Sequence, residues 1–255
     1  MLALRTGRFV ARIARSDDDL RAAQRLRHLS FIDMRPGSQP RPDGLDADRF
    51  DADCHHVLIE EEASGEPVCC FRLLLLESGD EIARSYSAQF YELSGLRDHR
   101  GRLAELGRFC IHPDRAGDPD ILRLAWAAMA RIVDAAQVEL LFGCASFEGT
   151  DAARHHDAFV LLKERHIAPR RWLPRIKAPK VFPFARRLRD VRANPRSGLA
   201  ALPPLLRSYL AMGGWVSDHA VVDPDLNTLH VFTGLEIRAI PAARARWLRA
   251  TAASA

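Results

Sequence analysis

The sequence predicts an α+β fold, in which helices cover a mixed β-sheet. The first observation is the order of the predicted elements, which runs strand, helix, hairpin, strand, helix, strand, helix and then strands. The second is size: 255 residues, 47% of them hydrophobic, can bury a large core without disulfides or metals. The third is that no internal repeat or linker divides the chain. We therefore expect one domain, 1–255, with a basic insertion at 165–196.

The first elements follow from local patterns. Alternation of apolar residues with arginine predicts a strand at 9–14. Ser16 followed by three aspartates is typical of a helix N-terminus, and the helix then runs over 20–31. Residues 33–53 are rich in Pro, Gly and Asp and predict a long loop. A loop of that length in a compact domain is usually functional or disordered.

The middle and the end of the chain show the apolar patterns that are typical of strands and of helices. A turn at Ser64-Gly65 separates two apolar runs and predicts a hairpin. The helix expected at 121–133 is apolar nearly all round, so we expect it to be buried. Another helix is expected at 203–213, because prolines stand at its start and glycines at its end. The remaining predictions are a helix at 151–165 and strands at 55–60, 68–76, 103–111, 138–146, 215–222 and 229–232.

Composition excludes several classes of protein. Five cysteines without a CxxC pair indicate neither a disulfide framework nor a zinc site. No run approaches the roughly 20 apolar residues that span a bilayer, and the N-terminus lacks a signal-peptide core. GxSxG, P-loop and GxGxxG motifs are missing, which excludes the commonest hydrolase, NTPase and dinucleotide-binding classes. We expect a cytoplasmic protein without a metal.

The net charge of +4 is too small to indicate nucleic-acid binding, but the charge is unevenly distributed. Segment 165–196 carries eleven basic residues and one acid, Asp190. It is either a solvated, proline-rich loop or a docking surface for an acidic protein or an anionic membrane. Its prolines disfavour a nucleic-acid recognition helix. The candidate docking residues are Arg170, Arg171, Arg175, Lys177 and Lys180.

A strand with the sequence Glu105-Leu-Gly-Arg108-Phe109 is the first candidate for chemistry. Gly107 inside a strand indicates a bulge or a close backbone approach. A bulge would leave backbone N–H groups unpaired and suited to a carbonyl oxygen. The alternative is an edge-strand pair of charges that serves solubility alone.

The second candidate is Asp51 and Asp53, which could bind a cation. A metal is not expected there, because the neighbouring His55 and His56 point to opposite faces of a strand. Arg72 lies in an apolar strand and needs an acidic partner, for which Asp51, Asp53 and Glu105 are the candidates. The histidines at 155 and 156 fit a helix surface.

Four motifs follow one another along the chain: Arg27-xxx-Phe31, Phe50-Asp51-x-Asp53, Cys70-x-Arg72-Leu73-Leu74 and Glu105-Leu-Gly-Arg108-Phe109. Their order and spacing resemble those of acyl-homoserine-lactone synthases and of bacterial ornithine N-acyltransferases, both GNAT-type N-acyltransferases. Segments 143–150, 202–206 and 221–228 resemble the ornithine enzymes. A tryptophan that the lactone synthases carry just after Phe31 is replaced by Ile32-Asp-Met34.

The resemblance implies a GNAT fold and transfer of a 3-hydroxyacyl chain from acyl carrier protein to the α-amine of ornithine, which gives lyso-ornithine lipid. No bound cofactor is expected, since the donor is the phosphopantetheine thioester. Loop 112–119 has one glycine and several acids, a poor cradle for a coenzyme A pyrophosphate. Because carrier proteins are acidic, the basic segment is a natural docking surface; the inner-membrane surface is the other possible partner.

The resemblance also assigns roles. Glu105 is the candidate base and Gly107 lies at the oxyanion-binding kink. Asp51 and Asp53 would hold the side-chain ammonium of ornithine, and Arg108 and Arg72 its carboxylate or acidic partners. Ser146 and Phe147 would line the acyl tunnel or belong to a turn and the core. The remaining site residues are Arg27, Phe31 and Phe109. Two alternatives stay open: another acceptor (glutamine, lysine, glycine or S-adenosylmethionine), or a catalytically silent GNAT-fold protein that binds carrier protein or membrane.

Overall fold

A computed structural model describes residues 3–34 and 41–254 and divides the chain into two compact units. The first unit contains Met1–Leu75, Leu106–Val138 and Ala242–Ala255, and the second contains Leu76–Glu105 and Glu139–Pro241. Residues 35–40, in the middle of the loop predicted at 33–53, lie outside the described residues. The basic segment 165–196 belongs to the second unit.

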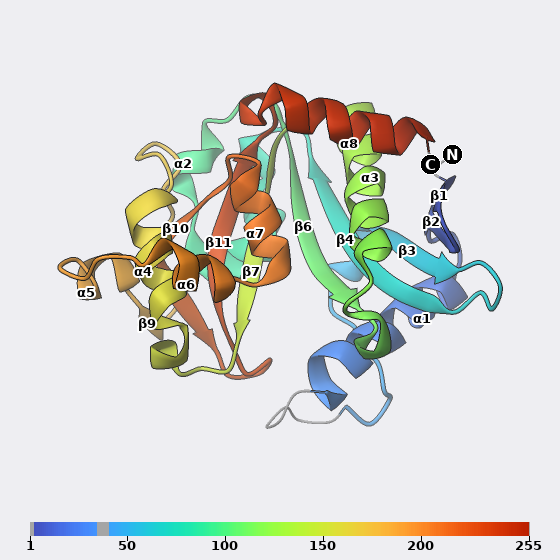
Figure 1. The fold of residues 1–255 in the computed structure, drawn as a ribbon, viewed down its shortest axis with the longest axis horizontal. Coiled ribbons are helices and arrows are strands. Elements are labelled where there is room, and N and C mark those ends of the chain that lie inside the picture. Colours follow the sequence, from blue (N-terminus) through green and yellow to red (C-terminus); the bar gives the residue numbers. More distant parts are fainter. Residues whose placement is uncertain (1–2, 35–40, 255) are drawn as a thin grey trace. The chain divides into compact units, whose positions relative to one another are not determined.

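Antiparallel strands and three helices build the first unit (Figure 1). Strands β1 to β4 pair in chain order, and β6 lies next to β4. The hairpin of β3 and β4 confirms the turn predicted at Ser64-Gly65. Residues 102–105 of β6 belong to the second unit. The elements are β1 (Ala3–Thr6), β2 (Phe9–Ile13), α1 (Asp17–His28), β3 (His55–Glu61), β4 (Pro67–Leu76), β6 (Arg102–Ile111), α3 (Pro119–Ala135) and α8 (Ala242–Ser254).

Helix α1 begins where the sequence predicts. The Ser16 hydroxyl accepts a hydrogen bond from the Asp19 backbone N–H at 3.1 Å, and the Asp19 carboxylate accepts one from the Ser16 N–H at 3.3 Å. This capping box satisfies two backbone donors at the helix start. The α-helix ends at His28 and continues as one π-helical turn, Leu29–Asp33. Ala23 and Leu26 pack against Leu58, which fixes the face of α1 that meets the sheet.

Long strands and short helices build the second unit. Its strands pair antiparallel in the order β7-β11-β10-β9, and β10 has a bulge between Val216 and Ala220. The elements are β5 (Tyr91–Glu92), α2 (Ser94–Arg97), β7 (Val138–Glu148), α4 (His156–Arg165), β8 (Arg175–Ile176), β9 (Val181–Phe182), α5 (Phe184–Arg187), α6 (Pro195–Ala200), α7 (Pro204–Ala211), β10 (Trp215–Asp223) and β11 (Thr228–Glu236).

The predicted fold class is confirmed: strands flanked by helices form an α+β fold. Sequence patterns missed the short elements, because two- to six-residue segments such as β8 and α6 are too short to show a periodicity. They also missed the 13-residue helix α8, whose sequence is dominated by alanine and arginine. One further finding concerns membranes. Among the described helices, none combines the length and the apolar character needed to cross a bilayer.

Candidate active site

A buried arginine on α1 is the starting point of the site. Arg27 lies in the last turn of the helix with 1% of its surface exposed, so its charge requires partners. Its Nε donates to the Asp46 carboxylate at 3.0 Å, and its Nη1 donates to Asp51 Oδ1 at 2.8 Å. Gln24, one turn earlier, donates to Asp51 Oδ2 at 2.9 Å. The end of α1 is thereby tied to the segment that precedes β3.

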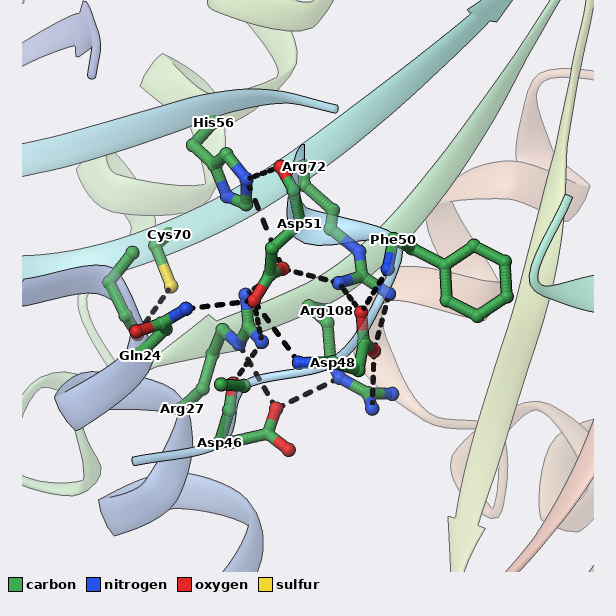
Figure 2. A network of polar contacts seen from close by, with 12 residues as sticks. Gln24, Arg27, Asp46, Asp48, Phe50, Asp51, His56, Cys70, Arg72 and Arg108 are labelled. Atoms are coloured by element: carbon green, nitrogen blue, oxygen red, sulfur yellow. Dashed lines mark hydrogen bonds and ion pairs between the residues drawn. The ribbon is translucent and has the colours of Figure 1, made fainter. Parts of the chain in front are cut away.

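Two more arginines reach the same acids from neighbouring strands (Figure 2). Arg72 of β4 contacts both Asp48 oxygens, at 2.6 Å and 2.8 Å, and also hydrogen-bonds to Asp51. Arg108 of β6 contacts Asp46 at 2.9 Å and Asp48 at 3.0 Å. We call this group the Arg–Asp network; its members are Gln24, Arg27, Asp46, Asp48, Asp51, His56, Arg72 and Arg108.

Opposite charges pair within the Arg–Asp network. Burial raises the pKa of Asp51, but hydrogen bonds and charge from Arg27 outweigh this effect and leave the pKa well below its usual range. The pKa of Asp48 is lowered too, because Arg72 and Arg108 outweigh its burial. Burial lowers the pKa of His56, whose Nε2 donates to the Asp51 carbonyl at 2.9 Å. Arg41 adds a fourth guanidinium group, 3.2 Å from Asp46.

Strand β6 is kinked at the network. Arg108 has a φ of 53°, in the left-handed region that costs a non-glycine residue about 1–3 kcal/mol. The structure therefore places the kink predicted near Gly107 one residue later. A Cβ at Gly107 would lie 3.4 Å from Arg72 Nε, close to an ordinary contact distance, so an alanine would just fit beside Arg72. Asp46 and Asp48 hold the strained Arg108 through its guanidinium.

Glu105 makes its contacts in the second unit. Its carboxylate is 5% exposed and accepts hydrogen bonds from the backbone N–H groups of Tyr86 and Ser87, both at 2.7 Å. The Ser87 hydroxyl donates to Glu105 Oε1 at 2.6 Å. Both carboxylate oxygens thus anchor the turn at 86–87, so a proton acceptor role would compete with these bonds.

The structure brings four of the predicted site residues together: Arg27, Asp51, Arg72 and Arg108. Asp53 is exposed whereas Asp51 is buried, so the two acids predicted to share one cation do not face the same place. Asp51 is instead one of the acidic partners that Arg72 was expected to need.

The aromatic candidates make apolar contacts. In the first unit, Phe31 packs against the core under α1, and Phe109 stacks on Phe71 at 5.9 Å. In the second unit, Ser146 is exposed on β7. Phe147 is 1% exposed within the core and lies 5.0 Å from the Phe159 ring.

Sequence reasoning missed Asp46 and Asp48. The signal was available: acids recur through the loop at 43, 46, 48, 51 and 53, and each buried arginine nearby needs a partner. Which acids turn inward depends on the loop's path, which no periodicity describes. The docking candidates Arg170, Arg171, Arg175, Lys177 and Lys180 are all exposed in the second unit.

Comparison with known proteins identifies the family. Residues 26–127, which hold most of the Arg–Asp network, match the model of the acetyltransferase (GNAT) domain. The chain is 38% identical to L-ornithine N(alpha)-acyltransferase of Rhodobacter capsulatus over 237 residues, 90% of each protein. It is 32% identical to the enzyme of that name from Brucella abortus, over 92% of this chain and 87% of the relative.

The chain belongs to the L-ornithine N(alpha)-acyltransferase family. It is therefore an N-acyltransferase enzyme of the GNAT type, as the motifs predicted. In structure it is also similar to FeeM, an N-acyl amino acid synthase from uncultured soil microbes, with 12% identity over 91% of this chain and 93% of that one, at a TM-score of 0.49.

Proposed function

We propose that this member of the family transfers a 3-hydroxyacyl chain from acyl carrier protein to the α-amine of ornithine, which gives lyso-ornithine lipid. Relatives named L-ornithine N(alpha)-acyltransferase support ornithine as the acceptor. The structural observation that carries the proposal is the strained Arg108 in β6, fixed by the buried Arg–Asp network. Strain of this kind is maintained only where surrounding contacts hold it, and it concentrates at functional sites.

The proposed reaction needs few groups. The neutral α-amine attacks the thioester carbonyl carbon, and an N–C bond forms while the C–S bond breaks. The amine nitrogen gives up a proton, and the departing phosphopantetheine thiolate takes one up. Backbone N–H groups at the Gly107–Arg108 kink would stabilise the negative oxygen of the tetrahedral intermediate, the role that oriented backbone donors play in acyl transfer.

The Arg–Asp network mainly positions this kink. Because its charged groups pair with one another and most of them are buried, it offers little free charge to a substrate. Asp48 and Arg108 are the exceptions, with 19% and 10% of their side chains exposed. We propose that Asp48 contacts the side-chain ammonium of ornithine and Arg108 its carboxylate. Asp51 and Arg72 then act as positioning residues.

Glu105 remains our candidate base, acting through a water molecule. A direct role would require the carboxylate to release a bond from Ser87 or Tyr86. Glutamine at 105 keeps one acceptor oxygen but places an NH2 group against a backbone N–H, so Glu105→Gln weakens the 86–87 turn as well as removing a base. The base role predicts lost turnover at an unchanged thermal midpoint, whereas a role in the turn alone predicts that any loss of turnover comes with a lower midpoint.

The start of α3 supports a carrier-protein donor. In phosphate-binding proteins, the backbone N–H groups at a helix N-terminus face the phosphate. Here the Asp118 carboxylate occupies that position and accepts a hydrogen bond from the Asp120 N–H at 3.0 Å. Asp120 adds a second acid in the first turn. A pyrophosphate would meet negative charge at this place, whereas an acyl carrier protein brings a single phosphate.

The experiment is mass spectrometry of products from purified protein, 3-hydroxypalmitoyl carrier protein and a pool of free amino acids. We expect one product, N-acylated ornithine. A different acylated amine would refute ornithine as the acceptor. An intact thioester with all amines present would refute the activity. The same incubation with 3-hydroxypalmitoyl coenzyme A tests the donor, and we expect the carrier thioester to react faster.

A further inference from the structure

A pair of buried cysteines lies within the first unit, packed against helix α1. Cys70 of β4 and Cys110 of β6 are 1% and 5% exposed, and their sulfur atoms lie 3.4 Å apart. Strands β4 and β6 are neighbours in the sheet. Both cysteines belong to one apolar cluster with Ala23 and Leu26 of α1. The mechanism above uses neither thiol.

The two sulfur atoms are close enough to form a disulfide after a small movement. A disulfide bond is about 2.05 Å long, so the sulfur atoms of Cys70 and Cys110 have to approach each other by about 1.3 Å. Neighbouring strands lie about 4.8 Å apart, which is within the Cα separation of about 4.4–6.8 Å that a disulfide spans. Both cysteines are free thiols. The pair is therefore a dithiol in a geometry that favours oxidation to a disulfide.

The surroundings make the two thiols unequal. Burial raises the pKa of Cys110, but hydrogen bonds from Cys70 and Ser30 outweigh this effect and lower it, and the charge of Arg27 acts in the same direction. The hydrogen bond to Cys110 and burial raise the pKa of Cys70 well above its usual range. The thiolate is the nucleophile in thiol oxidation, and Cys110 is also the more exposed of the two. We therefore expect Cys110 to attack an oxidant first and Cys70 to react with the product.

Each cysteine lies two positions from an arginine of the Arg–Asp network. Cys70 precedes Arg72 on β4, and Cys110 follows Arg108 on β6. Figure 2 shows Cys70 beside the network. Arg72 has little freedom to follow a movement of its strand, because it contacts both oxygens of Asp48, at 2.6 Å and 2.8 Å. A displacement of about 1 Å can lower the rate of an enzyme on the order of 100-fold, so a disulfide that draws β4 and β6 together would disturb the kink at Arg108.

We propose that Cys70 and Cys110 are an oxidation site, at which a hydroperoxide converts the two thiols into a disulfide that slows acyl transfer. The Cys110 thiolate attacks the terminal peroxide oxygen, an S–O bond forms and the O–O bond breaks, and the other oxygen takes up a proton and leaves as water or an alcohol. The Cys70 sulfur then attacks the sulfenic acid, an S–S bond forms and the S–O bond breaks, and the hydroxyl group leaves with the Cys70 proton as water. Two electrons pass from the thiols to the peroxide. The loss of activity rests on the proposed function, whereas the formation of the disulfide does not.

The first measurement is the mass of the intact wild-type protein after treatment with hydrogen peroxide. We expect the loss of two hydrogen atoms, about 2 Da, and a cross-link between the tryptic peptides 50–72 and 109–115. Cys70→Ala should abolish this cross-link. The matched control is Cys69→Ala, which removes the equally buried neighbouring thiol of β4 and should keep the cross-link. No cross-link in the wild-type protein, or a sulfinic acid at Cys110 in its place, overturns the inference.

The second measurement is the rate of ornithine acylation with 3-hydroxypalmitoyl carrier protein before and after oxidation. We expect a loss of at least about tenfold in the wild-type protein and in Cys69→Ala, which dithiothreitol reverses, and no loss in Cys70→Ala. A disulfide that leaves the rate unchanged overturns the effect on acyl transfer. If the reduced wild-type protein acylates no ornithine, the proposed function fails, and the mass measurement still decides the oxidation site. That measurement uses the wild-type protein, so it also decides the case in which a variant does not fold.

Discussion

Replacing Arg27 by methionine should strongly destabilise the protein. Arg27 is 1% exposed and holds Asp46, which is fully buried, and Asp51, which is 6% exposed. Methionine fills a similar volume but leaves both carboxylates without their main partner on α1. Removing one member of a buried ion pair typically costs 3–5 kcal/mol, so we expect a loss of about 4 kcal/mol in the free energy of unfolding at pH 7. The measurement is urea unfolding followed by circular dichroism.

The pH dependence of this loss tests its cause. In the wild-type protein, Arg27 lowers the pKa of Asp51 below its value in the unfolded chain. The resulting stability is present above the unfolded pKa, about 4, and is lost as the pH falls towards the lower folded pKa. Arg27→Met lacks this contribution, so the difference between variant and wild type should shrink below about pH 4.

A matched control lies on the same helix. Arg21 is exposed and pairs with Asp18 across one turn at 3.4 Å. Exposed pairs of this kind contribute less than about 1 kcal/mol, so Arg21→Met should change the unfolding free energy by no more than that. If Arg27→Met cost no more than Arg21→Met, or if its cost did not fall with pH, the buried Arg–Asp network would not stabilise the fold as argued.

Three further predictions concern catalysis and docking. Gly107→Ala adds a Cβ at 3.4 Å from Arg72 Nε, close to an ordinary contact, so we expect kcat to fall by less than about threefold, whereas a much larger loss would show that the kink needs glycine at 107. Glu105→Gln should lower turnover by about 10²–10⁴ if Glu105 is the base, and near wild-type turnover would leave it only the role of holding the 86–87 turn. Charge reversal in the basic segment should raise KM for the carrier protein with little change in kcat, and lost vesicle binding with unchanged KM would indicate a membrane surface instead. The variant reverses Arg170, Arg171 and Arg175, and the control reverses Arg244 and Arg246, which are exposed on α8.

The sequence by itself determined the local elements and the family. The capping box at Ser16, the turn at Ser64-Gly65 and the all-round apolar pattern of α3 depend on neighbours within a few positions, and all three elements form as predicted. The ordered motifs from Arg27 to Phe109 were sufficient to predict an N-acyltransferase. The glycine in β6 also indicated a bulge or a close backbone approach near residue 107, and the left-handed Arg108 lies next to it.

Only the tertiary structure decided which charges meet. Arg72 was predicted to need an acid, yet the choice of Asp48 and Asp51 over Asp53 depends on the path of a loop whose hydrogen bonds reach α1, β4 and β6. The kink at Arg108 is equally non-local, because its left-handed backbone is held by Asp46 and Asp48 from far along the chain. The physical reason is burial: a charge removed from water needs a partner of opposite charge close by. Spacing along the sequence does not show which residue that partner is.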